Sequence, residues 1–303
     1  MKKPFNRGIL LFLLTVIILG STFVITKYLM KDLGPFLVVG LRIIIALIVI
    51  TPFAYQRGFQ WKMIKENRFI LFGLTGVALY FGLANAGLAL STAANASLIQ
   101  AAIPAVVALL SVIILKEGFS IQRGIGIGLS ILGVLLVSGL PAEQGASTFF
   151  GNILILGSVV AWGVYTIQSK ILSGDIDPLV STTASFYTGL VWLLPFIGWE
   201  ISRSGLPIIP AISWLSLLYL GMIASALAYF LWNQALTKLD ASTVGPFLNL
   251  IPIIGLLFAI FSGEHVTFPQ IIGGLLAIIG VMITQNLINL PKGPVNEISS
   301  LTN

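Results

Sequence analysis

The 303-residue chain contains no cysteine and a single histidine, His265. Disulfide bonds, thiol catalysis and cysteine-ligated metals are therefore excluded, and one histidine cannot form a multi-histidine metal centre. Charged residues are also scarce, at 9% of the chain, whereas a soluble domain carries about 25%. The sequence has too few charges to cover a surface that faces water.

Long uncharged runs take the place of the missing charges. Eight stretches of 19 or more residues contain no Asp, Glu, Lys or Arg, and about 20 apolar residues at roughly 1.5 Å each cross the hydrocarbon core of a bilayer. We therefore predict an all-α integral membrane protein with ten transmembrane helices. The predicted helices lie at 8–30, 35–55, 69–90, 95–115, 123–139, 149–172, 179–200, 213–235, 243–261 and 269–290.

The two halves of the chain repeat each other. Nine residues between Ala93 and Val137 recur between Ala241 and Thr284, at an offset of 148 before the Glu-containing turn and 147 after it. Earlier in the halves, four further pairs match at a constant offset of 143. The pairs are Gly20 and Gly163, Lys27 and Lys170, Pro35 and Pro178, Pro52 and Pro195, Ala93 and Ala241, Pro104 and Pro252, Leu109 and Leu257, Glu117 and Glu264, Gly126 and Gly273, Leu129 and Leu276, Ile131 and Ile278, Gly133 and Gly280, and Val134 and Val281.

This repetition divides the chain into two five-helix repeats, 8–140 and 149–290, followed by a tail, 291–303, that we predict to be disordered. Five is an odd number of spans, so the second repeat enters the membrane from the opposite side. Inverted repeats place a binding site near the midplane between the halves, where rocking of one half against the other alternates access. The symmetry favours a transporter over a channel or a purely structural duplication.

The distribution of Lys and Arg predicts the orientation. If the N-terminus is cytoplasmic, the inside segments hold twelve of these residues and the outside segments hold three. Cytoplasmic loops of membrane proteins carry this excess of basic residues. We therefore expect both termini to be cytoplasmic and the protein to be a multi-pass protein of the cell (cytoplasmic or inner) membrane.

Paired motifs link the sequence to a known family. The second half carries SALAYFLWNQALTKLDAS and then LIPIIGLLFAIFSGEHVTFPQIIGGLLAIIGVMI, and the first half carries KEGFSIQRGIGIGLSILGV. In these segments the chain resembles an EamA-type carrier of the drug/metabolite transporter superfamily. The resemblance implies ten helices around a central cavity, transport of small organic solutes, most often outward, and no cofactor. Two features depart from the family pattern, namely LGSTF in the first helix in place of a Trp-Gly pair and Lys116 before Glu117 in place of glycine.

Arg42 is the charged residue that lies deepest in a predicted span, seven residues after Pro35. A guanidinium at the centre of a membrane helix costs about 2.5–3.5 kcal/mol on insertion scales, so it must face a cavity, a partner or water. Arg42 is either a group that binds a carboxylate of the substrate or a structural arginine that binds helix carbonyls.

Polar and aromatic residues within the spans are the other candidates for substrate binding. Uncharged polar groups are costly against lipid, so most should face the interior of the bundle, where they bind a solute or join helices. Aromatic residues in the middle of a span suit the wall of a cavity for an amphipathic molecule, although Trp and Tyr also form belts at the membrane interface. The candidates are Ser21, Thr22, Arg42, Tyr80, Asn85, Gln100, Trp162, Tyr165, Ser169, Tyr229, Trp232, Asn233 and Asn249.

Other residues have structural interpretations beside functional ones. Pro104 and Pro252 interrupt the predicted helices 95–115 and 243–261 as hinges or as fixed bends. Lys27 extends its stem toward the lipid headgroups. The paired acids Glu117 and Glu264 fall at helix ends and are expected to make capping or gate contacts. The glycines of 123–139 and 269–290 allow close helix contact within the chain or in a homodimer.

Several functions compete on this sequence. The leading hypothesis is a secondary transporter that exports amino acids or related small organic metabolites. A multidrug cation exporter would need a carboxylate within the membrane, and no Asp or Glu falls in the middle of a predicted span. A sugar-phosphate or nucleotide-sugar carrier would need several basic residues in the cavity.

An enzyme is not expected, since no nucleophile, base or metal constellation is present, and a membrane scaffold is the residual alternative. The expected partners are a small-molecule substrate and lipid but no nucleic acid, because the basic residues are split among short loops.

Overall fold

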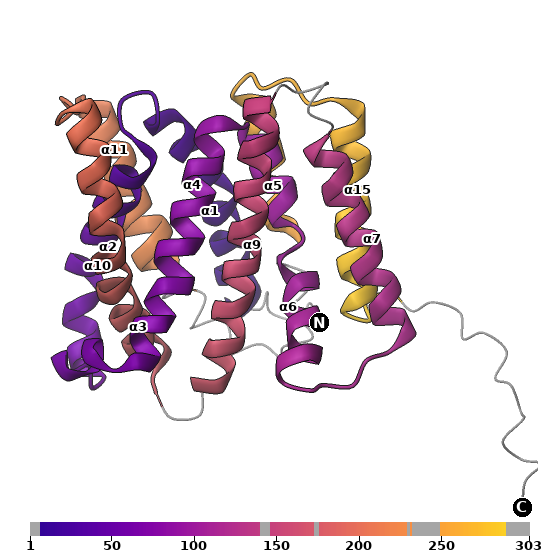
Figure 1. Ribbon diagram of the computed structural model, residues 1–303, viewed down its shortest axis with the longest axis horizontal. Coiled ribbons are helices and arrows are strands. Elements are labelled where there is room, and N and C mark those ends of the chain that lie inside the picture. The colour runs from indigo at the N-terminus through magenta and orange to yellow at the C-terminus, as the bar shows by residue number, and fades with distance from the viewer. Residues whose placement is uncertain (1–6, 140–145, 173–175, 229–230, 232–248, 289–303) are drawn as a thin grey trace, which may run out of the picture.

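The computed structural model describes residues 7–139, 146–172, 176–228, 231 and 249–288, and throughout these ranges every regular element is a helix (Figure 1). The first half contains α1 (Arg7–Leu29), α2 (Pro35–Gln56), the 3₁₀ helix η1 (Trp61–Lys65), α3 (Asn67–Gly73), the π-helix η2 (Leu74–Leu79), α4 (Tyr80–Leu90), α5 (Ala93–Gln100), α6 (Ile103–Ile114) and α7 (Ile121–Ser138). The second half contains α9 (Ala146–Leu172), α10 (Pro178–Ser204), α11 (Ala211–Leu218), the π-helix η3 (Tyr219–Leu227), α14 (Leu250–Phe261) and α15 (Phe268–Thr284).

These helices have the composition of a membrane bundle. Six helical segments are long and apolar enough to cross a bilayer, and four shorter apolar ones accompany them in the described part of the chain. The six are 35–56, 67–90, 93–114, 121–138, 148–169 and 178–204, and the four are 13–29, 211–227, 250–261 and 268–284. Each of these segments overlaps one of the ten ranges predicted from the sequence. The all-helical membrane architecture is thereby supported, whereas the number of crossings and their direction stay predictions.

The fourth predicted helix differs from its prediction. The sequence places Pro104 inside one helix, 95–115, but the structure has α5 and α6 there, with Ala101 and Ala102 between them. The amides of these two alanines donate to carbonyls only three residues back. Pro104 lies in the first turn of α6, where its missing N–H interrupts no hydrogen bond of that helix. The helix therefore breaks before the proline rather than bending at it.

Pro252 also lies near a helix start, as the third residue of α14. The preceding part of the predicted helix, 243–248, lies outside the described residues, as does the predicted tail 291–303.

Glycines bring α7 and α15 into close contact, and Figure 1 shows the two helices side by side. A Cβ on Gly133 would come within 2.4 Å of the Gly273 carbonyl oxygen, and one on Gly280 within 2.5 Å of the Gly126 carbonyl oxygen. These four glycines are repeat partners, so the same small residue serves both sides of one interface. Their function is packing between the two halves of a single chain.

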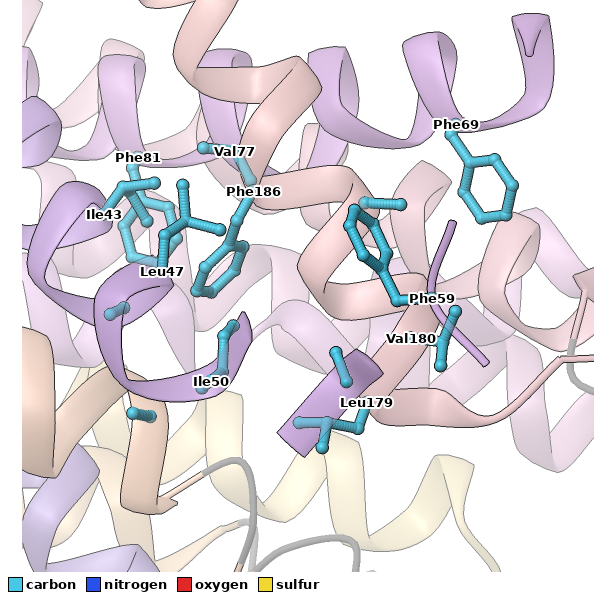
Figure 2. Packing of buried hydrophobic residues seen from close by; sticks show 14 of the residues in the cluster. Ile43, Leu47, Ile50, Phe59, Phe69, Val77, Phe81, Leu179, Val180 and Phe186 are labelled. Carbon is cyan, nitrogen blue, oxygen red and sulfur yellow. The ribbon is translucent and has the colours of Figure 1, made fainter. Parts of the chain in front are cut away.

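A buried apolar cluster holds α2 against α4 and α10 (Figure 2). Ile43 and Leu47 of α2 belong to the same cluster as Phe81 of α4 and Phe186 of α10, and all four side chains are buried. Burying such side chains is the main favourable term in packing, so these contacts fix the rotation of α2. They thereby also fix the direction of Arg42, the residue before Ile43.

Candidate functional site

A cavity of about 750 Å³ lies between helices of the two halves. Ten of the thirteen candidate binding residues are described by the structure, and nine of these ten line the cavity. Pro104 and Pro252 line it as well. Tyr229, Trp232 and Asn233 lie outside the described residues. The nine are Thr22, Arg42, Tyr80, Asn85, Gln100, Trp162, Tyr165, Ser169 and Asn249.

Ser21 is the candidate that the structure does not place in the cavity wall. Its hydroxyl donates to the carbonyl of Ile18 at 2.8 Å and shares a 2.6 Å hydrogen bond with the hydroxyl of Tyr219. Ser21 joins α1 to η3, which is the helix-joining alternative considered for such residues.

Arg42 lies on α2 and is only 6% exposed. Its Nε donates to Ser225 Oγ at 2.7 Å, and its guanidinium lies 4.7 Å from the centre of the Phe81 ring. Ser225 in turn donates to the carbonyl of Leu220, five residues back in the π-helix η3. The guanidinium is thus held by a ring from the first half and a hydroxyl from the second, at the wall of the cavity.

Aromatic rings form a continuous wall on one side of the cavity. The ring centre of Trp162 lies 4.4 Å from that of Tyr80 and 4.9 Å from that of Tyr165. Tyr165 stacks on Phe72 at 4.2 Å. A Cβ on Gly76 of η2 would come within 2.1 Å of the Tyr165 ring, so this position requires glycine for the ring to lie where it does.

The amides of the cavity wall fall into two groups. Asn85 donates to the carbonyl of Pro35 at 3.2 Å, and Gln100 accepts from the Tyr80 hydroxyl at 3.1 Å. By contrast, Asn249 Nδ2 and Gln285 Oε1 are buried without a hydrogen-bond partner. Gln285 also lines the cavity, although it is not among the residues predicted from the sequence. Unpaired buried polar atoms are uncommon in folded proteins and call for an explanation.

The charged residues among the described lining residues are Arg42, Glu117 and Arg123. Glu117 and Arg123 form an ion pair at 3.6 Å, and their side chains are 30% and 29% exposed. The cavity therefore reaches the molecular surface near this pair, beside the α6–α7 connection at the lower edge of Figure 1. We call this region, marked by Glu117, Arg123 and Gln285, the open end.

Charged side chains cap helices at the opposite end of the bundle, and neither Lys27 nor Glu264 is among the described residues that line the cavity. Glu264 accepts hydrogen bonds from the amides of Ala93 and Ala94, both at 2.9 Å, and so caps the N-terminus of α5. The prediction of a capping contact for Glu264 is confirmed. This glutamate belongs to the second half and the helix to the first, so the cap joins the two repeats.

The prediction that Lys27 extends toward the lipid headgroups is wrong. Its ammonium donates to the carbonyls of Leu88, Ala89 and Ser91 at 2.7, 3.2 and 2.6 Å. Lys27 thus caps the C-terminus of α4 and does not extend toward the headgroups, because three carbonyls at the end of a helix offer a cation stronger partners. The side chain of its repeat partner, Lys170, lies outside the described side chains.

A buried polar network that the sequence reading missed lies beside these caps. Gln270 donates to Asn95 Oδ1 at 2.6 Å, and Ser91 and Asn95 both donate to Asn152 Oδ1, at 2.5 and 3.3 Å. The network joins α5, α9 and α15. We call the region of Lys27, Glu264 and this network the sealed end. The network could have been suspected from the polar residues inside uncharged runs, but the sequence does not show which of these residues form hydrogen bonds with one another.

Known proteins resemble this chain along most of its length. An uncharacterized transporter from Bacillus subtilis, YyaM, is 26% identical over 93% of this chain and 94% of its own. A probable amino-acid metabolite efflux pump from Salmonella typhimurium is 28% identical over 89% and 92% of the two chains. A probable terminal-alkyne amino-acid exporter from Streptantibioticus cattleyicolor is 30% identical over 70% and 71%.

Structural comparison supports the fold. One crystal structure aligns with a TM-score of 0.65 and 19% identity, over 91% of this chain and 96% of the other. The sequence profile of the EamA-like transporter family matches twice, at residues 6–139 and 149–285, the two halves that the internal repeat delimits. The chain belongs to the EamA-like transporter family.

Proposed function

We propose that the protein is a secondary transporter that exports amino acids or related small organic metabolites across the cytoplasmic membrane by alternating access. The observation that carries this proposal is one cavity, walled by residues of both halves, that reaches the surface at the open end, while Glu264 of the second half caps α5 of the first half at the sealed end. A carrier built from inverted repeats needs such a site between its halves.

Ten crossings with both termini in the cytoplasm fit the arrangement of basic residues. Arg57 forms an ion pair with Asp177 at 3.3 Å, so the loop before η1 and the start of α10 lie at the same end. Figure 1 places the start of α3 and the α6–α7 connection at that end too. These segments hold Arg57, Lys62, Lys65, Arg68, Lys116 and Arg123. By the positive-inside rule this is the cytoplasmic face, so the cavity opens to the cytoplasm.

The names of two relatives, an amino-acid exporter and an amino-acid metabolite efflux pump, support amino acids as the substrate class. The contents of the cavity favour them over the alternatives. The acid among its described lining residues, Glu117, is paired with Arg123, which disfavours a cation exporter. Lys27 caps a helix and does not line the cavity, which leaves too few cations for a phosphate-rich substrate.

The hinge proposed for the transport cycle is the α5–α6 break. Ala101, Ala102 and Pro104 follow the capped start of α5 and lead toward Glu117. A break without full helical hydrogen bonding bends at lower cost than a continuous helix. Pro252, at the equivalent place in the second half, has the same proposed role.

The test is a metabolite profile of the medium around cells that overproduce the protein. Ala84 lines the cavity, and Ala211 is exposed at the start of α11 and is not among the described lining residues. We expect cells with the wild type or with Ala211→Trp to release a solute that accumulates in the medium, and cells with Ala84→Trp, whose cavity is filled, not to release it. Identical profiles for all three would contradict the proposal.

A further inference from the structure

We infer that a groove between α2 and α10 binds an anionic phospholipid of the cytoplasmic leaflet, with an acyl chain in the groove and the phosphate beside Lys62 and Lys65 of η1. The inference goes beyond the proposed function, because no residue of this groove is among the described residues that line the solute cavity. It is therefore independent of the identity of the exported solute.

The groove is an open, apolar hollow of about 580 Å³. Its α2 wall runs from Ile44 to Tyr55, and Tyr187 and Leu190 of α10 form the facing wall. Ile44 is 42% exposed and Ile48 of the same wall is 70% exposed. Apolar surface left open on a folded protein marks a site of interaction, and in a membrane-spanning bundle the neighbour of such a surface is lipid.

The polar groups inside the groove bind each other. The hydroxyls of Thr51 and Tyr187 share a hydrogen bond of 3.1 Å that joins α2 to α10. The other lining side chains are apolar, apart from the hydroxyl of Tyr55 near the end of α2. Because a polar solute would have to give up its hydration without gaining partners here, the groove suits a hydrocarbon chain.

The length and depth of the groove match one leaflet. α2 extends from Pro35 to Gln56, so Ile44 lies near its middle and Tyr55 near its end. The eleven residue steps between these two lining residues cover about 16 Å at about 1.5 Å each, which is close to half of a hydrocarbon core of about 30 Å. A single acyl chain that enters from the surface at the open end therefore fits along the groove.

Aromatic rings mark the place where the groove meets the membrane surface. Trp61 is the first residue of η1, and its ring centre lies 4.8 Å from that of Tyr187 and 6.3 Å from that of Tyr55. Trp and Tyr favour the depth of the lipid headgroups. η1 therefore begins beside the groove at headgroup level, and Lys62 and Lys65 follow Trp61 as exposed residues of the same short helix.

The charge of these two lysines is not offset locally. The two arginines nearest to η1 in the sequence, Arg57 and Arg68, each form an ion pair with a carboxylate. No carboxylate in the described part of the chain forms an ion pair with Lys62 or Lys65. Basic residues at the cytoplasmic surface attract anionic headgroups, so a phospholipid with a net negative charge complements this site better than a zwitterionic one.

The internal repeat provides a comparison at the other end of the same helix pair. At the offset of 143, Gly198 stands in place of Tyr55 and Glu200 in place of Arg57. Glu200 accepts hydrogen bonds from two amides of the first turn of α2. The equivalent position at the sealed end thus lacks the tyrosine and carries an acid instead of a base, which restricts the proposed lipid site to the open end.

Two lipids with identical acyl chains test the inference. The full-length chain, purified in detergent, is titrated with dioleoyl phosphatidylglycerol and with dioleoyl phosphatidylcholine. Native mass spectrometry measures the affinity for the first bound lipid, and thermal unfolding measures the stabilisation. We expect phosphatidylglycerol to bind about fivefold more tightly or better and to raise Tm at lower concentration. Equal affinities for the two lipids, or no bound lipid, would overturn the inference.

A tryptophan in the groove tests where the acyl chain binds. Ile48→Trp should weaken the binding of both lipids at least about tenfold, since excluding even two methylenes from the groove has an effect of this size. Val191→Trp is the matched control, because Val191 is the repeat partner of Ile48, is 63% exposed and is not a lining residue of the groove. Lipid binding by Ile48→Trp equal to that of the control would overturn the assignment of the groove.

A double variant tests the headgroup site. Lys62→Gln with Lys65→Gln should abolish the preference for phosphatidylglycerol and leave the affinity for phosphatidylcholine unchanged. Lys31→Gln with Arg203→Gln is the control, because it makes the same change in net charge at exposed positions of the sealed end. A preference that persists in the first double variant, or that is lost equally in both, would overturn the assignment of the phosphate to η1.

Discussion

Glu264 and Glu117 occupy equivalent places in the two repeats but have different partners. Glu264 accepts two backbone hydrogen bonds from the other half of the chain, beside a buried polar network. Glu117 pairs with Arg123, six residues away in its own half, and both side chains are partly exposed. The same residue type at the same place in the repeat therefore caps a helix of the other half at one end of the molecule and lines the mouth of the cavity at the other.

This difference shows how a duplicated sequence departs from symmetry in a single structure. If both glutamates capped a helix of the opposite half, both ends would be closed and no solute could enter. If neither did, the two halves would lack the cap that Glu264 provides. An arrangement with one end sealed and one open is the state expected of a carrier that alternates access.

The largest expected effect comes from breaking the sealed end at Glu264. Hydrogen bonds to charged groups contribute about 1.5–3 kcal/mol each, so Glu264→Ala, which removes two, should destabilise the folded protein by about 3–6 kcal/mol. Thermal unfolding in detergent measures this loss. A Tm within one degree of the wild type would show that the cap contributes little.

The same variant should also change which end is accessible. The chain has no cysteine, so Gln100→Cys places a single thiol in the cavity wall. In the wild-type background an impermeant thiol reagent should reach it from the open end alone, and with Glu264→Ala from both sides of the membrane. Labelling from one side in both backgrounds would contradict the assignment of Glu264 to the seal.

Lys27→Met should have a smaller effect at the same end. A cation at a helix C-terminus contributes up to about 2 kcal/mol in partly buried geometries, so we expect a loss of about 1–2 kcal/mol in unfolding free energy. Lys31→Met is the control, because Lys31 is exposed and contacts the ring of Tyr28. Equal stability of the two variants would refute the capping role.

Glu117→Ala should lower the free energy of unfolding by less than about 1 kcal/mol, since partly exposed ion pairs contribute about that much or less. Comparison with Glu264→Ala in the same unfolding assay sharpens the contrast between the two ends. A loss as large as that of Glu264→Ala would mean that Glu117 also holds the halves together.

A labelling pair with little expected effect on stability tests which end faces the cytoplasm. Lys62→Cys and Lys31→Cys place thiols in exposed positions at the open and sealed ends. In intact cells an impermeant reagent should label position 31 and not position 62. The reverse result would invert the orientation and place the open end outside.

Residues of the cavity wall could be predicted from the sequence, because the cost of a polar group against lipid can be judged from its own segment alone. A polar group inside an uncharged run is costly against lipid, and this reasoning placed Arg42, Gln100 and Asn249 toward the interior without knowledge of their partners. Ser21 satisfied the same reasoning but faces Tyr219, since a pattern that demands burial does not distinguish a cavity from a helix contact.

Contacts between segments that are far apart in the chain could not be predicted from the sequence. Lys27 and the carbonyls at the end of α4 are more than sixty residues apart, and Asn95 and Gln270 are 175 apart. Neither pair falls at equivalent places in the repeat, so the internal symmetry gave no guide to them. The helix break at Ala101 was missed for another reason, because proline marks a region of disruption without fixing the residue at which the hydrogen bonds change.

The two π-helices have a consequence for how the cavity wall is set. η2 begins at Leu74 and η3 at Tyr219. Their offset of 145 falls between the offset of 143 in the early part of the repeat and that of 147–148 in the late part, so both halves contain a π-helix in the same predicted helix. A π-turn holds about one residue more than an α-turn and rotates the helix that follows by roughly 100°. Deleting one residue from Leu74–Leu79 would therefore turn Tyr80 away from Trp162. Because both halves contain the extra residue, we infer that it was inserted before the duplication. Each copy then inherited the same rotation of the helix that follows the π-turn.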